Sequence, residues 1–139
     1  MRFFKWGASR KGAYNLVNTK TIDSALRFTA DMYQRGTFMC LSFTGKHKHL
    51  NLEKGGAILT DDKKAYRWFK RARFSGRREC SYHEDDFDML GWNFYMMPSV
   101  SLRGIMLMEK FYNMDGSKRV MEDIELPYPD LSKFEIYGI

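Results

Sequence analysis

Proline, cysteine and long apolar runs are scarce in this chain, and each scarcity argues against a class of protein. Its 139 residues include three prolines, two cysteines and three histidines. No run of about 18 apolar residues occurs, so we expect no membrane-spanning helix. Residues 1–7 include charges and lack the apolar segment of a secretory signal. Cys40 and Cys80 could pair, but without an export signal we expect free thiols in the cytoplasm of a cell or of an infected host.

The composition fits one globular domain, but the charge is distributed unevenly. Hydrophobic residues make up 44% of the chain, so we expect a single domain over residues 1–139 and no extensive disorder. Residues 1–44 hold seven Lys/Arg and two Asp/Glu, a net of +5. Residues 45–80 hold eleven and four (+7), and residues 81–139 hold five and eleven (−6). This asymmetry favours a polyanionic partner, although an unevenly charged surface without any partner has the same composition.

The stretch from Thr60 to Phe74 has the clearest pattern in the sequence. Thr60 or Asp61 is a good helix N-cap, and acidic residues there suit the positive end of the helix dipole. Apolar residues recur at helical spacing and form one stripe, at Ala65, Trp68, Phe69 and Ala72. Cations cover the other side and continue past it, at Lys63, Lys64, Arg67, Lys70, Arg71, Arg73, Arg77 and Arg78. We expect Gly76 to end this basic helix.

The rest of the chain predicts one more helix and several strands. A helix is expected over residues 22–35, because its apolar residues recur at helical spacing, with Thr21 as cap and Gly36 as stop. Thr37–Thr44 is apolar on both faces, which indicates a central strand. Shorter extended segments are expected at residues 2–6, 14–17, 57–59, 79–83, 92–97 and 134–137.

The C-terminal part predicts a hairpin. Residues 101–112 and 117–126 read as extended runs, and Asp115-Gly116 between them is a typical hairpin turn. The order of elements predicts an α+β fold with two layers, in which two helices pack on one face of a mainly antiparallel sheet.

A nucleic-acid interface is the leading hypothesis for the cations. Phosphates require spaced Lys and Arg side chains, and single strands also require exposed aromatic rings on which bases can stack. The candidate phosphate-contacting residues are Arg10, Lys11, Lys46, Lys48, Lys63, Arg67, Lys70, Arg71, Arg77 and Arg78. Most aromatic residues of so small a domain are needed for its core, and basic helix faces also occur without a partner.

Two clusters suggest a metal, neither with a full signature. Three imidazoles and one thiolate could bind tetrahedral zinc, from His47, His49, Cys80 and His83. The acidic run Glu84–Asp88 could instead hold Mg²⁺ or Mn²⁺ beside the cations, as a metal-dependent nuclease requires. The simpler alternative for the first cluster is surface histidines and a buried thiol. For the acidic run it is a solvated loop or the start of a helix, and the run could also dock internally on the arginines. No cofactor is therefore expected.

Tyr66 and Lys70 lie one turn apart on the basic helix, downstream of His47 and His49. This arrangement resembles the HUH replication initiators of small single-stranded DNA viruses and phages. The resemblance implies a divalent metal on the histidines and attack of a helix tyrosine on a DNA phosphate. The sequence departs from that family because Lys48 stands between the histidines in place of a hydrophobic residue, and no His-x-His follows the helix.

We therefore expect a small basic protein that binds DNA or RNA through phosphate contacts and is not an enzyme. The alternative is an accessory or inhibitor protein of viral type that binds a host protein or a small phosphorylated ligand. Metal-dependent nicking of DNA is a lesser alternative. Methionines at 96, 97, 106 and 108 would support protein recognition if they proved to be exposed.

Overall fold

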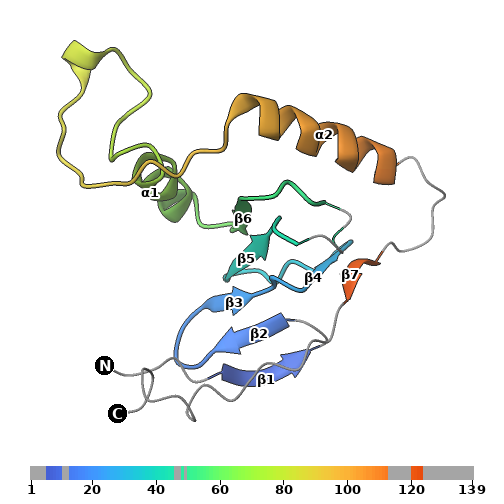
Figure 1. Ribbon diagram of the computed structural model, residues 1–139. Helices are drawn as coiled ribbons and strands as arrows, with labels where there is room; N and C mark the ends of the chain where they lie inside the picture. Colours follow the sequence, from blue (N-terminus) through green and yellow to red (C-terminus); the bar gives the residue numbers. More distant parts are fainter. Residues whose placement is uncertain (1–5, 11–12, 46–47, 49, 113–119, 124–139) are drawn as a thin grey trace, which may run out of the picture.

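The structure, a computed structural model, describes residues 6–10, 13–45, 48, 50–112 and 120–123 (Figure 1). Five strands form one sheet in the order β1-β2-β3-β5-β6. Their bounds are Trp6–Arg10 (β1), Ala13–Leu16 (β2), Thr21–Asp23 (β3), Phe38–Ser42 (β5) and Gly56–Leu59 (β6). All neighbours are antiparallel except β3 and β5, which are parallel. The sheet is therefore mainly antiparallel, as predicted.

Two α-helices and a small second sheet complete the part of the chain that the structure describes. The helices are α1 (Lys63–Ala72) and α2 (Pro98–Tyr112), with the short 3-10 helix η1 (Tyr82–Glu84) between them. Strand β4 (Arg27–Thr29) pairs with β7 (Val120–Asp123). This combination confirms the α+β class. The predicted turn at Asp115-Gly116 and the strand at 134–137 lie outside the described residues.

Strand β5 occupies an interior position, because it pairs with β3 on one side and β6 on the other. Met39 on β5 is only 1% exposed and packs with Ala13 of β2 and Ile22 of β3. Side chains on a strand alternate between the two faces, so Met39 and Leu41 share one face while Phe38 and Cys40 share the other. The predicted central strand is thus confirmed.

The predicted helix over residues 22–35 is wrong. Ile22 is buried on β3, where it pairs with Asn15 and Met39 of the neighbouring strands. The chain then turns, and the amide of Ala25 donates a hydrogen bond of 2.8 Å to the Asp23 carboxylate. A side chain that accepts from the backbone two residues later is a typical turn contact, and here it ends the strand. Strand pairing in the sheet has overridden a local apolar spacing that also fits a helix.

The expected extended run at residues 101–112 is also wrong, because this segment is helix α2. Pro98 occupies the first position of α2, where a missing amide hydrogen costs nothing. The helix lies beside Leu52, and a Cβ at Gly104 would approach the Leu52 side chain to 3.0 Å. The expected strands at 79–83 and 92–97 are not formed either, apart from a single bridge between Phe74 and Asn93.

The helices meet the sheet near its β5–β6 edge (Figure 1). On α1, the ring of Phe69 packs edge-to-face on Phe38, with centroids 5.8 Å apart. On α2, Gly104 and Ile105 border an apolar pocket whose other walls include Leu41 and Leu59. No helix formed by the described residues has the length and apolar character that crossing a membrane requires.

Candidate nucleic-acid interface

Helix α1 begins after Asp62, which is its N-cap in place of the predicted Thr60 or Asp61. The Asp62 carboxylate accepts hydrogen bonds from the amides of Lys64 (2.8 Å) and Ala65 (3.0 Å). This is the N-cap contact that satisfies amide groups in the first turn. Asp61 instead binds the Tyr33 hydroxyl (2.8 Å) and the Gly36 amide (3.0 Å). These bonds anchor the start of α1 to the loop before β5 and lower the pKa of Asp61, with the Tyr33 hydroxyl as the main cause.

The apolar side of α1 is narrower than predicted. Ala72 is buried and Phe69 is half-buried, but Trp68 is 51% exposed. The helical period of 3.6 residues places Lys63 and Arg67 on the side opposite Ala72. Both side chains are exposed. Trp68 therefore does not anchor α1 as expected, while Lys63 and Arg67 face solvent.

Two cations of α1 are held by carboxylates of the segment that follows the helix. The Nζ of Lys70 lies 2.6 Å from Oε2 of Glu79. The guanidinium of Arg71 pairs with Asp88 and also donates, from Nε, to the Gly76 carbonyl (3.1 Å). Each pairing lowers the pKa of its carboxyl group, chiefly through the hydrogen bond from the cation. Lys70 and Arg71 thus already have anionic partners.

Arg77 and Arg78 are also paired, around the carboxylate of Asp85. The Asp85 side chain is buried and lies 3.3 Å from Nε of Arg77 and 3.8 Å from Nε of Arg78. Burial alone would raise the pKa of Asp85, but amide hydrogen bonds from Phe87 and Arg78 and the Arg77 guanidinium bring it below its usual value. The Arg77 guanidinium also lies over the ring of Tyr82, 5.3 Å from its centroid. Asp85 therefore organises this loop and is not a free metal ligand.

The segment from Ser75 to Trp92 forms a loop closed at its base. The Ser75 amide donates to the Trp92 carbonyl (2.9 Å), and the Trp92 amide donates to the Ala72 carbonyl at the end of α1 (2.7 Å). Gly76 has a φ of +77°, and a Cβ on it would meet the Met89 carbonyl oxygen at 1.8 Å. Gly76 was predicted to end the basic helix, but α1 already ends at Ala72 with Arg73 as its C-cap. Gly76 instead allows this close crossing of the chain. The loop projects away from the sheet in Figure 1.

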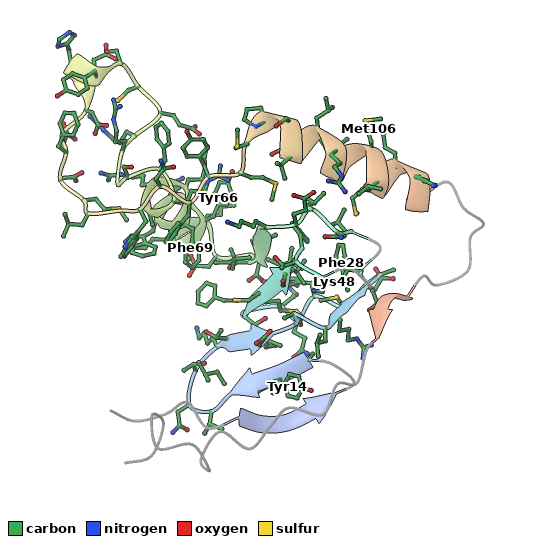
Figure 2. The ribbon with its side chains drawn as sticks, in the orientation of Figure 1. Tyr14, Phe28, Lys48, Tyr66, Phe69 and Met106 are labelled. Atoms are coloured by element: carbon green, nitrogen blue, oxygen red, sulfur yellow. The ribbon has the colours of Figure 1, made fainter. Side chains whose placement is uncertain are left out.

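An open groove of about 1250 Å³ runs between α1, β6 and the segment that leads into α2. Aromatic rings line it from two elements, with Tyr66 and Phe69 on α1 and Trp92, Phe94 and Tyr95 on the returning chain. Figure 2 shows Tyr66 and Phe69 on the helix beside this returning chain. Cations line it as well, at Lys54, Lys70 and Arg73. Aromatic residues and cations are thus combined in one groove.

Some of the other residues that were predicted to contact phosphate are buried, and some lie outside the described residues. Lys48 is 7% exposed, and its Nζ donates to the carbonyl oxygens of Ser42 (2.7 Å) and Ala25. Figure 2 shows it among the strands. Lys48 is therefore part of the protein interior, which corrects the prediction. Lys11 and Lys46 lie outside the described residues, and Arg10 ends β1.

The predicted zinc ligands are described only in part. His47 and His49 lie outside the described residues, while Cys80 and His83 are exposed. Over residues 13–45, 48 and 50–110, no three His, Cys, Asp or Glu side chains form a group that could hold a metal ion. Cys40 and Cys80 are free thiols, as expected. Burial raises the pKa of the Cys40 thiol, so this cysteine is not activated as a nucleophile.

Tyr66 and Lys70 lie together, as their spacing predicts. The Nζ of Lys70 is 5.9 Å from the centroid of the Tyr66 ring, and Tyr66 is exposed. The aromatic groove itself was not predicted from the sequence. The run Trp92-Asn93-Phe94-Tyr95 was the available signal, because alternate aromatic residues on an extended segment present their rings on one side.

Neither the family models nor the curated proteins give any match to this chain, and no solved structure matches its fold.

Proposed function

We propose that this protein binds nucleic acid in the cytoplasm through phosphate contacts made by α1, without catalysis. The observation that carries the proposal is the pair of exposed cations Lys63 and Arg67 on the solvent side of the helix. Neither has an acidic partner among the described residues, in contrast to Lys70 and Arg71. Cations without an internal partner can release counterions when they meet phosphates, and this release drives binding.

Neighbouring residues extend this surface. Lys64 and Arg73 are exposed on α1 and at its end, again without an ion pair in the described part of the chain. A strand laid along α1 would pass these cations in turn, since helical residues three or four apart are neighbours. The internal pairing of Lys70, Arg71, Arg77 and Arg78 reduces the predicted interface to a smaller set of cations. Binding should therefore be weaker than the sequence suggests and largely independent of base sequence.

Charge reversal on the helix tests the proposal. In the double variant K63E/R67E, we expect the affinity for a labelled oligonucleotide to fall at least tenfold, measured by fluorescence anisotropy at about 0.1 M salt. The matched control is K20E/K110E, which reverses two exposed lysines away from α1 and changes the net charge equally. If both variants lost the same affinity, the effect would come from total charge and the proposed site would be wrong.

A second candidate function is recognition of another protein through α2. Leu102, Ile105 and Met106 on this helix are all more than half exposed, and Figure 2 shows Met106 pointing away from the sheet. Exposed apolar residues on one helix favour the accessory or inhibitor alternative. The substitutions L102S and M106S would then abolish capture of the partner and leave oligonucleotide affinity unchanged.

A further inference from the structure

We infer that the groove beside α1 binds the unpaired bases of a single-stranded nucleic acid. This inference rests on the proposed function and names its ligand more closely: a strand whose phosphates lie on α1 and whose bases enter the groove. The carrying observation is the set of exposed rings that line the groove together with cations. The bases of a duplex are already stacked on one another and cannot reach such rings.

The rings are arranged as a stacking platform. Trp92 and Phe94 are parallel, with an interplanar angle of 5° and centroids 6.2 Å apart. Both remain exposed, and Phe94 exposes 73% of its surface. A ring that leaves most of its surface to solvent in a folded chain gains by covering it, and every base offers a flat face for that purpose. Tyr66, on α1, adds a third exposed ring to the lining of the groove.

The charge of the groove complements a phosphodiester chain. Lys54 and Arg73 line it and have no ion pair among the described residues. The nearby carboxylate of Glu53 is engaged by Arg103, with Nη1 and Oε1 3.3 Å apart. The Glu53 carboxylate in the lining is thus already paired, while the Lys54 and Arg73 side chains have no ion pair among the described residues. An extended apolar peptide would use the rings but would gain nothing from Lys54 and Arg73.

Backbone contacts hold the two walls of the groove together. The Trp92 amide donates to the Ala72 carbonyl, and the Phe94 amide donates to the Arg73 carbonyl (2.8 Å). The rings of the returning chain are therefore fixed at the C-terminal end of the helix that carries Tyr66. On the floor, a Cβ at Gly55 would lie 2.8 Å from the Met96 methyl group, so a glycine there leaves room for this packing. Binding then needs little rearrangement of the protein.

The helical period joins the groove to the phosphate surface. Lys63 and Tyr66 are three residues apart on α1, and Tyr66 and Lys70 are four apart, so the three lie along one flank. Phosphates on Lys63 and Arg67 would leave the attached bases within reach of Tyr66. The same arrangement explains why aromatic residues of a small domain are exposed beside its cations.

An abasic strand tests the inference. We compare the affinity of the full chain for oligothymidine and oligouridine of about 12 nucleotides with its affinity for an abasic phosphodiester tract of equal length. We expect at least one base-bearing strand to bind ten or more times tighter than the abasic tract. The variant Y66L/F94L keeps apolar volume but removes two flat rings, and it should abolish this preference. The matched control Y82L/F87L removes the same ring types outside the groove and should retain it.

The outcomes separate the inference from the proposed function. Equal binding of the abasic and base-bearing tracts, or a preference that survives in Y66L/F94L, would overturn the groove as a base site while leaving phosphate binding by α1 intact. If no tract bound even at about 0.05 M salt, the proposed function itself would be overturned. Circular dichroism of each variant establishes that it is folded before the affinities are compared.

Discussion

Lys70 and Glu79 form an ion pair, with Nζ and Oε2 2.6 Å apart, across the end of α1. Arg71 and Asp88 form a second pair one residue further along the helix. Together they divide the basic helix into cations that the protein neutralises itself and cations that it leaves to solvent. The division does not follow from the composition of the helix, because Lys63 and Lys70 are the same residue type on the same element.

The first prediction concerns Glu79. The substitution E79Q removes the acidic partner of Lys70 beside the groove, so the ammonium group becomes available to a phosphate. We expect the affinity for single-stranded oligonucleotides to rise severalfold, and the salt dependence of log K to steepen by about 0.7. The control E109Q removes an exposed acid from α2 and should change neither quantity. A fall in affinity in E79Q would show that Glu79 orders the site and does not compete with phosphate.

The second prediction concerns acid stability. The pKa values of Glu79, Asp85 and Asp88 are all lower in the folded protein than in an unfolded chain. Their stabilising contribution is therefore complete above the unfolded values, about 3.9 for Asp and 4.3 for Glu, and is lost as the pH falls through the folded values. We expect the urea midpoint to change little from this source between pH 7 and 5 and to decline below about pH 4.

The double variant E79Q/D88N provides the control for acid stability. It lacks Glu79 and Asp88 but keeps Asp85 and Asp61, whose pKa values are also lowered. Its urea midpoint should therefore start lower at pH 7 and decline less below about pH 4. Parallel pH profiles in the two proteins would contradict the assigned role of these ion pairs.

The third prediction compares two glycines with nearly the same backbone angle. Gly76 (φ +77°) and Gly36 (φ +75°) both adopt the left-handed region, where an alanine costs about 1–2 kcal/mol. A Cβ at Gly36 meets nothing within 4 Å, whereas a Cβ at Gly76 would overlap the Met89 carbonyl oxygen. G76A should therefore lower the free energy of unfolding by at least about 1 kcal/mol more than G36A. Equal losses would mean that the loop is not closed at Gly76.

The fourth prediction concerns the buried Lys48. In K48M the carbonyl oxygens of Ala25 and Ser42 lose this donor, and we expect a loss of about 1–3 kcal/mol in the free energy of unfolding. Oligonucleotide affinity and its salt dependence should not change, measured at a temperature where the variant is folded. If the affinity of K48M for the oligonucleotide depended less steeply on salt, Lys48 would contact phosphate and its assignment to the interior would be wrong.

The sequence correctly predicted those helices and strands for which the local pattern of apolar and charged residues is enough to determine the structure. The apolar run of β5 and the cations of α1 belong to this group, whereas the N-cap of α1 was expected at Thr60 or Asp61 and is Asp62. The segment 22–35 does not belong to this group. Ile22 and Leu26 fit a helical stripe, but both are buried in a segment that forms two short strands joined by a turn. The extended segment expected at 92–97 stops before Pro98, but proline also begins helices, and the helix formers Leu, Met and Glu that follow favour this second use.

The site was less predictable than the fold because it depends on contacts between residues distant in the sequence. Pairing of Arg71 with Asp88 requires the loop that Gly76 closes, and the acidic run alone does not show which arginine it meets. The burial of Lys48 likewise depends on carbonyl groups of Ala25 and Ser42, at separations of 23 and 6 residues. The composition does not distinguish these cations, although in the folded protein some are paired or buried and others are exposed to solvent.

The most direct test of the account removes equal charge from the two parts of α1. The double variants K63Q/R67Q and K70Q/R71Q are compared by the slope of log K against log salt concentration for a single-stranded oligonucleotide. The account predicts a slope shallower by about 1.4 in K63Q/R67Q and nearly unchanged in K70Q/R71Q, because only the first pair releases counterions on binding. An equal or larger loss of slope in K70Q/R71Q would contradict it.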